Sequence, residues 1–175
     1  MTRIYTRTGD DGSTGLADGR RLAKNDPLIE AIGTVDECNA HLGALICLTQ
    51  DPALAGTLQE IQHRLFDVGA ILAGAPGISL GAQQVQKLEH WIDDLESPLP
   101  PLTAFVLPGG NAASTQAHIA RAVCRRAERR LLDIADRTQL EGPVYMFFNR
   151  LSDYLFIVAR SLALHEDQLE VKWQR

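Results

Sequence analysis

The sequence predicts an all-α protein, a five-helix bundle preceded by an N-terminal ligand-binding loop. After residue 26, apolar residues recur at spacings of three, four and seven over most of the chain. Turn-forming residues, mainly proline, glycine and aspartate, divide this pattern into five segments. No segment has a strong strand pattern, so we expect the helices to bury one another's apolar faces.

The first three helices are expected in the N-terminal half of the chain. The first begins at position 27, where a proline suits the start of a helix, and extends to about Leu48. The second begins after Asp51, again with a proline in first place. Residues 74–81 are rich in glycine and form a loop, and the third helix covers about 82–95.

The last two helices follow a long connector. Residues 97–110 contain four prolines and end in two glycines, so they form an ordered connection rather than a helix or strand. Asn111 then caps the fourth helix, which extends to about Arg137. A turn at 141–143 precedes the fifth helix, which extends to about residue 164, and the polar last ten residues are expected to fray.

Composition restricts the class of protein. The chain has 175 residues, of which 45% are hydrophobic, which suits one globular domain with a sizeable core. We expect a single domain over 1–175, with the ligand-binding loop at 1–25, the bundle at 26–165 and a tail at 166–175. Seventeen basic against 22 acidic residues give a net charge of −5, which argues against a nucleic-acid partner.

Cellular location is inferred from what the sequence lacks. Three cysteines without a CxxC spacing argue against a disulfide framework or a structural zinc site, and they fit a reducing compartment. The first 25 residues carry acids and no apolar core, so they are not a signal peptide. No apolar stretch reaches 18 residues, so no membrane partner is expected and a cytoplasmic location is predicted.

The N-terminal loop is the first candidate binding site. Its hydroxyls, guanidinium and glycines suit a cradle in which backbone N–H groups approach phosphate oxygens. The alternative is a flexible tail with a turn, because no Walker A motif is present. The candidate residues are Thr6, Arg7, Thr8, Gly9, Gly12, Ser13 and Thr14.

The fourth helix carries a charged stripe. Arg121, Arg125 and Glu128 fall on one face at 3.6 residues per turn. Six arginines against three acids over 111–137 give this segment a charge of +3 in an acidic protein. The stripe is either a solvated face with local ion pairs or an anion clamp, since arginine forks match phosphate oxygens.

The fifth helix combines an apolar sequence with a polar stripe. Asn149, Asp153 and Arg160 lie on one face of a helix that should be buried nearly all round. Buried polar groups need partners, which Asp36 and Asn39 of the first helix could supply. The stripe is therefore a structural polar network, a ligand site or a subunit interface.

Motifs for other chemistries are missing from the sequence. The five histidines show no metal-binding spacing, and no G-x-S-x-G or H-E-x-x-H motif occurs. No obvious nucleophile stands out, so the protein is expected to position reactants that supply their own chemistry. Phe105 lies in the proline-rich connector, and by itself it is more typical of a core aromatic.

Taken together, five segments resemble the PduO-type ATP:cob(I)alamin adenosyltransferases. They occur in the order found in that family and extend over most of the chain. They are YTRTGDDGSTGL at 5–16, RLAKND at 21–26, EAIGTVDECNAHLG at 30–43, FVLPGGNAASTQAHIARAVCRRAERRL at 105–131 and FFNRLSDYLFIVAR at 147–160.

The resemblance implies a fold, an assembly and a reaction. The family fold is a ferritin-like five-helix bundle, usually a homotrimer with active sites between subunits. Cobalt in the Co(I) state attacks C5′ of ATP, and triphosphate leaves as adenosylcobalamin forms. ATP, Mg²⁺ and cobalamin are the implied ligands, and a flavin reductase and an adenosylcobalamin-dependent enzyme are possible partners.

The resemblance also implies roles for individual residues. The loop from Thr6 to Thr14 wraps ATP, and Arg21 and Lys24 contact phosphate. Arg125 holds the phosphates with Arg126 nearby, Glu128 fixes ATP or its magnesium, and Asn149 contacts the nucleoside. Asp36 and Arg121 form an intersubunit salt bridge, and Phe105 blocks the lower axial face of the corrin.

Two positions depart from the family pattern, and one alternative function remains open. Leu28 stands where many relatives carry arginine, and Cys38 replaces the usual leucine as a small core hydrophobe. The alternative is a corrinoid-binding carrier or an ATP-binding regulatory protein without turnover.

Overall fold

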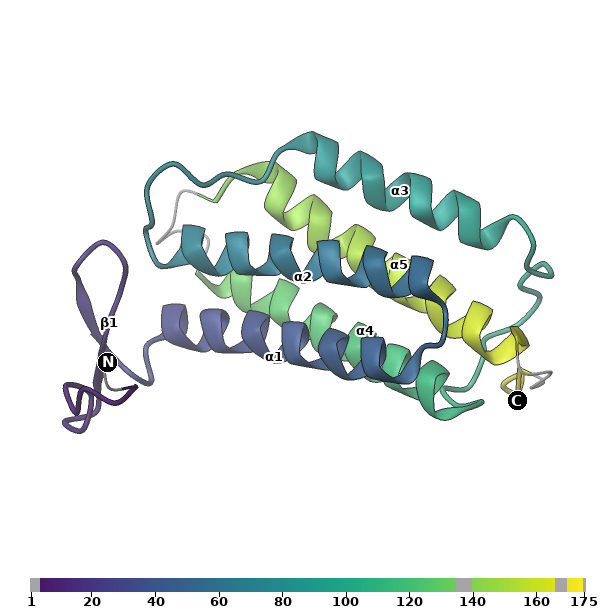
Figure 1. Ribbon diagram of the computed structural model, residues 1–175, viewed down its shortest axis with the longest axis horizontal. Coiled ribbons are helices and arrows are strands. Elements are labelled where there is room, and N and C mark those ends of the chain that lie inside the picture. The colour runs from purple at the N-terminus through teal and green to yellow at the C-terminus, as the bar shows by residue number, and fades with distance from the viewer. Residues whose placement is uncertain (1–3, 135–139, 166–169, 175) are drawn as a thin grey trace.

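The computed structural model describes residues 4–134, 140–165 and 170–174, and the predicted bundle is confirmed over them (Figure 1). The helices are α1 (Pro27–Leu48), α2 (Pro52–Leu72), α3 (Ala82–Glu96), α4 (Ala112–Asp133) and α5 (Gly142–His165). None of the helices within these ranges is long and apolar enough to span a lipid bilayer.

Side-chain caps set the starts of three helices. The Asp26 carboxylate accepts a hydrogen bond from the Leu28 N–H at 2.9 Å, and Asp51 caps α2 in the same way. The Asn111 amide oxygen accepts from the Ser114 N–H at 2.7 Å, as its predicted capping role requires. Each cap satisfies a backbone donor that the helix itself leaves unpaired.

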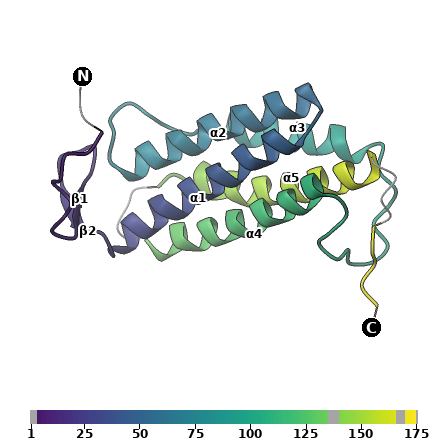
Figure 2. The same ribbon diagram turned by 60° about the horizontal axis from the view of Figure 1, so that its bottom comes forward.

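The helices pack in a fixed order of neighbours. α1 packs against α2 and α4, α4 packs against α5, and α5 packs against α3 (Figures 1 and 2). Fully buried alanines on α4, such as Ala117 and Ala120, allow its neighbours to approach closely. Cys38 is fully buried between apolar side chains, so its predicted core role is confirmed, and Leu28 also lies in the core.

The N-terminal segment contains a small sheet that the sequence reading missed. β1 (Ser13–Gly15) pairs antiparallel with β2 (Arg21–Ala23), with Thr14 opposite Leu22. Strands of three residues are too short to give a readable alternation. The hairpin projects from the end of the bundle at which α1 begins (Figures 1 and 2).

Two predicted boundaries also differ from the structure. α4 ends at Asp133, four residues before the predicted end, because Ile134 leaves the helical conformation at φ −113°. The remaining predicted residues of this helix, 135–137, lie outside the described residues. The tail was expected to fray, but residues 170–173 are held against the connector by backbone hydrogen bonds.

Candidate functional site

The N-terminal loop is closed by one arginine. Nη2 of Arg21 donates to the Thr8 carbonyl at 2.6 Å and to Ser13 Oγ at 2.5 Å. The Asp11 carboxylate accepts from the Ser13 hydroxyl and N–H, and these hydrogen bonds lower the pKa of Asp11. The loop is therefore an ordered turn, and not the flexible tail that was the alternative.

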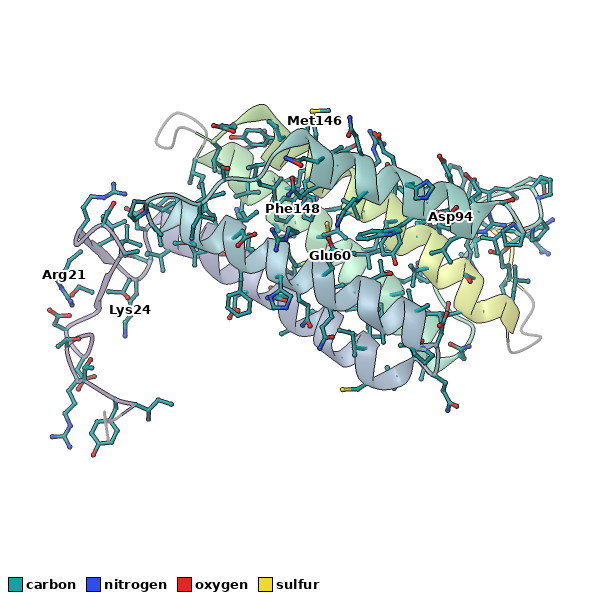
Figure 3. The ribbon with its side chains drawn as sticks, turned by 45° about the horizontal axis from the view of Figure 1, so that its top comes forward. Arg21, Lys24, Glu60, Asp94, Met146 and Phe148 are labelled. Atoms are coloured by element: carbon teal, nitrogen blue, oxygen red, sulfur yellow. The ribbon has the colours of Figure 1, made fainter. Side chains whose placement is uncertain are left out.

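Glycines permit the tight path of this loop. A Cβ on Gly9 would come within 3.0 Å of the Ser13 carbonyl oxygen, and Gly12 has a φ of +85° that favours glycine. The Lys24 side chain lies over Gly9, at 3.4 Å from that Cβ position. Arg21 and Lys24 both lie on the hairpin beyond the end of the bundle (Figure 3).

The other predicted loop residues are exposed and interact locally. The Thr6 and Thr8 hydroxyls lie 2.8 Å apart, and the Arg7 guanidinium lies 5.4 Å from the centroid of the Tyr5 ring. Arg7 has a φ of 61°, which is unusual for a residue with a side chain. Thr14 lies in β1 at the base of the loop. The N-terminal segment over residues 4–25 thus carries four cationic side chains, those of Arg7, Arg20, Arg21 and Lys24, beside the carboxylates of Asp10, Asp11 and Asp18.

The second group of predicted residues lies on the outer face between α4 and α5. Nδ2 of Asn149 on α5 lies 3.5 Å from Oε1 of Glu128 on α4, at the limit of a hydrogen bond. Arg125 is exposed one turn before Glu128 on the same helix, and its carbonyl accepts a hydrogen bond from Arg129. The structure brings these predicted residues together across two helices.

Arg121 lies further along the same face in an apolar setting. Its guanidinium is 6.0 Å from the centroid of the Phe156 ring, within cation–π range. Nε of Arg121 is buried and has no hydrogen-bond partner among the described residues. Burial lowers the pKa of this guanidinium, and the charge of Arg125 lowers it further.

Arg126 and Asp36 lie apart from this cluster within one chain. Arg126 points to the other side of α4, where it pairs with Glu37 of α1. Asp36 is exposed on α1, and no ion pair among the described residues joins it to Arg121. Arg126, which is not part of the charged stripe, therefore forms an ion pair with α1 on the surface of the bundle.

The residues of the polar stripe on α5 have different surroundings, since one is buried and two are exposed. Arg160 is buried and binds Glu170 of the tail, and Asn39 exchanges hydrogen bonds with Gln62 of α2. The suggested pairing of α5 with Asn39 of α1 is therefore wrong, because Asn39 binds α2 instead. Asn149 and Asp153 are exposed.

Phe105 is not a core residue. Its side chain is 78% exposed on the connector between α3 and α4. The α4 helix begins beside it and continues to Arg125, a rise of about 20 Å. The hairpin projects from one end of the bundle, and the connector that carries Phe105 leads into α4 at the opposite end (Figure 1).

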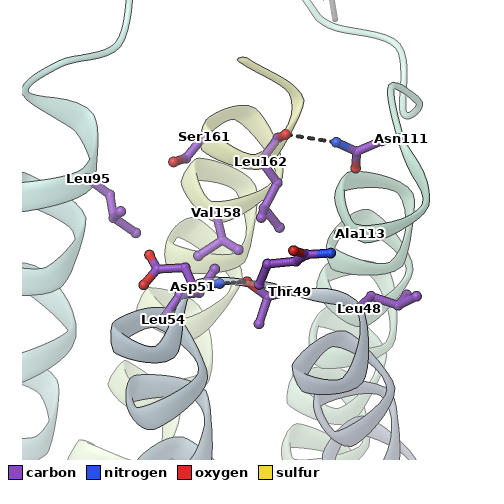
Figure 4. A pocket seen from close by; sticks show the side chains of 11 residues that line it. Leu48, Thr49, Asp51, Leu54, Leu95, Asn111, Ala113, Val158, Ser161 and Leu162 are labelled. Atoms are coloured by element: carbon purple, nitrogen blue, oxygen red, sulfur yellow. Dashed lines mark hydrogen bonds between the residues drawn. The ribbon is translucent and has the colours of Figure 1, made fainter. Parts of the chain in front are cut away.

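A cavity of about 410 Å³ opens at the connector end of the bundle (Figure 4). It contains none of the predicted site residues. Two of its polar groups already serve as helix caps, because Asp51 accepts from Ala53 and Asn111 binds Ser114 and Leu162. Its lining is otherwise mostly aliphatic, with Leu48, Leu54, Leu95, Val158 and Leu162.

Some candidate groups were missed by the sequence reading. His118 and Phe156 flank Arg121, and Glu37 holds Arg126. The spacing of three between His118 and Arg121 was a usable signal, whereas the contact with Phe156 is between helices. Within the described residues, no group of three or more His, Cys, Asp or Glu side chains could hold a metal ion.

The fold and its charges define a class: a five-helix bundle with an N-terminal hairpin beside arginine and lysine side chains, and an arginine-bearing face suited to an anionic ligand. Residues 4–162 match the family described as Cobalamin adenosyltransferase. The chain is 45% identical to the cobalamin adenosyltransferase of Cupriavidus metallidurans, over all of this chain and 96% of that protein. It is 41% identical to the human corrinoid adenosyltransferase MMAB, over 97% of this chain and 72% of that protein.

Solved structures give the same answer. A phenylalanine-to-alanine variant of the PduO-type ATP:corrinoid adenosyltransferase from Lactobacillus reuteri, complexed with cobalamin and ATP, superimposes with a TM-score of 0.93 at 35% identity. That match covers 99% of this chain and 100% of the other. An arginine-to-lysine variant complexed with ATP gives a TM-score of 0.90 at 36% identity, over 98% and 100%.

The chain therefore belongs to the cobalamin adenosyltransferase family. Its activity is the ATP-dependent adenosylation of a corrinoid.

Proposed function

We propose that this chain carries out the transfer with ATP held between the N-terminal hairpin and the α4–α5 face. The lone pair of Co(I) forms a bond to C5′ of ATP, the C5′–O bond breaks, and triphosphate carries away the electron pair. The observation that carries the proposal is the Glu128–Asn149 contact beside two arginines, one of which has a buried, unpaired donor. Such a face stabilises negative charge on a leaving group.

Each group on this face has a proposed role. Arg125 binds the phosphates through its planar fork. Arg126 points to the other side of α4, where Glu37 holds it, and its proposed role is limited to supporting Arg125 through its charge. Asn149 contacts the nucleoside. Glu128 fits a Mg²⁺ contact because Mg²⁺ takes few protein carboxylates and is otherwise bound by phosphate oxygens and water. Bound Mg²⁺ neutralises charge on the triphosphate.

Phe105 is proposed to cover the lower axial face of the corrin. An exposed ring in a constrained connector excludes an axial ligand, which makes reduction of Co(II) to Co(I) easier. The spacing of the changed residues supports this role. In the Lactobacillus reuteri enzyme, the altered phenylalanine and arginine lie twenty positions apart, the same separation as Phe105 and Arg125.

The active assembly is proposed to be a homotrimer with sites between subunits. The hairpin and the connector that carries Phe105 lie at opposite ends of one bundle, so a complete site is proposed to need two chains. Asp36 of one subunit supplies the partner that Arg121 of another lacks. In the cytoplasm, a flavin reductase would supply Co(I), and an adenosylcobalamin-dependent enzyme would receive the product.

The activity is tested by mixing the protein with ATP, Mg²⁺ and chemically reduced cobalamin. Adenosylcobalamin should form in the visible spectrum, and one triphosphate should be released for each product molecule. Binding of both ligands without triphosphate would instead identify a carrier or an ATP-binding regulatory protein.

The role of Phe105 is tested by the spectrum of Co(II)alamin bound with ATP. Phe105→Ala should keep ATP binding but retain the lower cobalt ligand, so the four-coordinate EPR signature should be lost. Chemically pre-reduced Co(I) should restore part of the rate, because the defect precedes alkyl transfer. A four-coordinate signature that persists in the variant would refute this role.

A further inference from the structure

The connector that carries Phe105 has little regular structure of its own. It contains four prolines, yet it presents an exposed aromatic ring. A side chain in an irregular segment samples many positions unless other contacts hold its backbone. Here the contacts come from residues 170–173, which we name the tail strap.

The tail strap pairs with the backbone on both sides of the Phe105 ring. The Trp173 N–H donates to the Phe105 carbonyl at 2.7 Å, and the Leu107 N–H donates to the Val171 carbonyl at 2.8 Å. Between these bonds, Val106 and Lys172 form an antiparallel bridge. The strap thus fixes the backbone from which the ring projects.

Side chains of the strap add two further contacts. The rings of Phe105 and Trp173 meet edge to face, with centroids 6.3 Å apart and an interplanar angle of 67°. Nζ of Lys172 donates to the Thr103 hydroxyl at 2.8 Å. The Trp173 ring restricts the rotamers that the Phe105 ring can adopt on its side.

One buried arginine anchors both segments to the bundle. The Arg160 side chain on α5 is 2% exposed, and that of Glu170 is 12% exposed. Nε of Arg160 donates to Oε1 of Glu170 at 2.6 Å, and Nη2 donates to Oε2 at 3.3 Å. The same Nη2 donates to the Pro100 carbonyl at 2.8 Å, so the guanidinium ties the strap and the connector to α5.

We propose that Arg160 and Glu170 are positioning residues for adenosyl transfer. Their ion pair holds the tail strap, and the strap holds Phe105 at the height where the ring meets the corrin. Neither side chain touches a reactant. The inference rests on the proposed role of Phe105, and it assigns the C-terminal segment a part in reducing the cobalt.

The primary test is Glu170→Gln, which keeps the size of the side chain but removes the charge that Arg160 needs. The fraction of four-coordinate Co(II) and the rate of the reaction started from Co(II) should fall by on the order of tenfold to a hundredfold. The KM for ATP should stay within about twofold of wild type, because no side chain of the strap is proposed to bind ATP. Pre-reduced Co(I) should restore much of the rate.

Hydrogen exchange provides a readout that does not depend on catalysis. The Leu107 and Trp173 amides donate across the strap, so both should exchange faster in Glu170→Gln while the α4 core amides stay protected. Glu89→Gln is the matched control, since Glu89 also binds an arginine, Arg150 at 3.2 Å, on an exposed surface. It should leave the exchange, the spectrum and the rate unchanged.

A double-variant comparison separates positioning from general destabilisation. Adding Glu170→Gln to Phe105→Ala should cause no further loss, because the strap acts through a ring that is already gone. A chain that ends after residue 169 serves as a second strap variant and should match Phe105→Ala. Circular dichroism should show the helical content of wild type in every variant.

Three results would overturn the inference: losses in the double variant that add, a fall in ATP affinity in Glu170→Gln, or an equal defect when the reaction starts from pre-reduced Co(I). Arg160 and Glu170 would then have a structural role alone. A different result would count against Phe105 itself. If Phe105→Ala leaves the cobalt spectrum unchanged while Glu170→Gln still exposes the Leu107 amide, the hold of the strap is supported and the role of the ring is refuted.

Discussion

The proposed phosphate contact of Arg125 can be tested by a single substitution, because arginine and lysine carry the same charge but differ in geometry. Arg125→Lys keeps one positive charge on the α4–α5 face but loses the planar fork that matches two phosphate oxygens. We expect kcat/KM for ATP to fall by on the order of a hundredfold, with the fold intact by circular dichroism. Turnover near that of wild type would place the phosphate contact elsewhere.

His118 should make the stability of the protein depend on pH. The ring is buried, and burial followed by the charge of Arg121 lowers its pKa, while Glu170 opposes the shift. Between the lowered pKa and the ordinary value near 6.5, the unfolded chain binds more protons than the folded one. The free energy of unfolding should therefore fall as pH drops below about 6.5.

The variant His118→Gln should lose that part of the pH dependence, as measured by urea unfolding at several pH values between neutral and mildly acidic. His63→Gln changes an exposed histidine and should keep the profile of wild type. Equal slopes in all three proteins would show that His118 does not contribute.

At the scale of the element, a substitution in the N-terminal loop should weaken ATP binding without changing the stability of the bundle. Gly12→Ala forces a side chain onto a φ of +85°, which costs about 1–2 kcal/mol in the loop. We expect the KM for ATP to rise by about tenfold, since 1.4 kcal/mol is a factor of ten in affinity. The unfolding midpoint of the bundle should not change.

The matched control replaces a glycine that has no such constraint. Gly56 lies on an exposed face of α2, and a Cβ there would meet no atom within 4 Å. Gly56→Ala should stabilise the bundle by about 0.5–1 kcal/mol and leave the KM for ATP unchanged. Identical effects of the two substitutions would mean that the loop is not an ordered ligand site.

Elements are predictable from sequence where their determinants are local. The starts of α1 and α2 follow from Asp-Pro pairs, and the start of α4 follows from the Asn111 cap. The β1–β2 hairpin was not predicted, because strands of three residues are too short to show a periodic pattern. The tail strap was not predicted, because its hydrogen-bond partners lie about 65 positions earlier in the chain and no local sequence pattern connects them.

The same distinction applies to the candidate site. Helical periodicity places Arg121, Arg125 and Glu128 on one stripe, and the structure confirms their shared face. Periodicity does not predict which other helix or segment packs against each face of a helix. The pairing of Arg126 with Glu37 and the burial of Arg160 against Glu170 therefore became visible only in three dimensions.

At the scale of the whole molecule, assembly should depend on Asp36. Its exposed carboxylate is proposed to reach Arg121 of another subunit, so Asp36→Ala would leave the half-buried Arg121 guanidinium without that partner. We expect light scattering to show weaker assembly and activity to fall with it. Asp94→Ala removes an exposed carboxylate on α3 and should leave both unchanged. A stable, fully active monomer would contradict the proposal.

The proposed site takes its hairpin and its Phe105 ring from different subunits, and this has a genetic consequence. A site that takes its loop from one subunit and its aromatic ring from another can be rebuilt from two damaged copies. In a mixed assembly, a chain with Gly12→Ala and a chain with Phe105→Ala would meet at some interfaces where every contributing group is intact. Two alleles that are each defective alone should then complement each other, whereas two alleles altered in the same element should not.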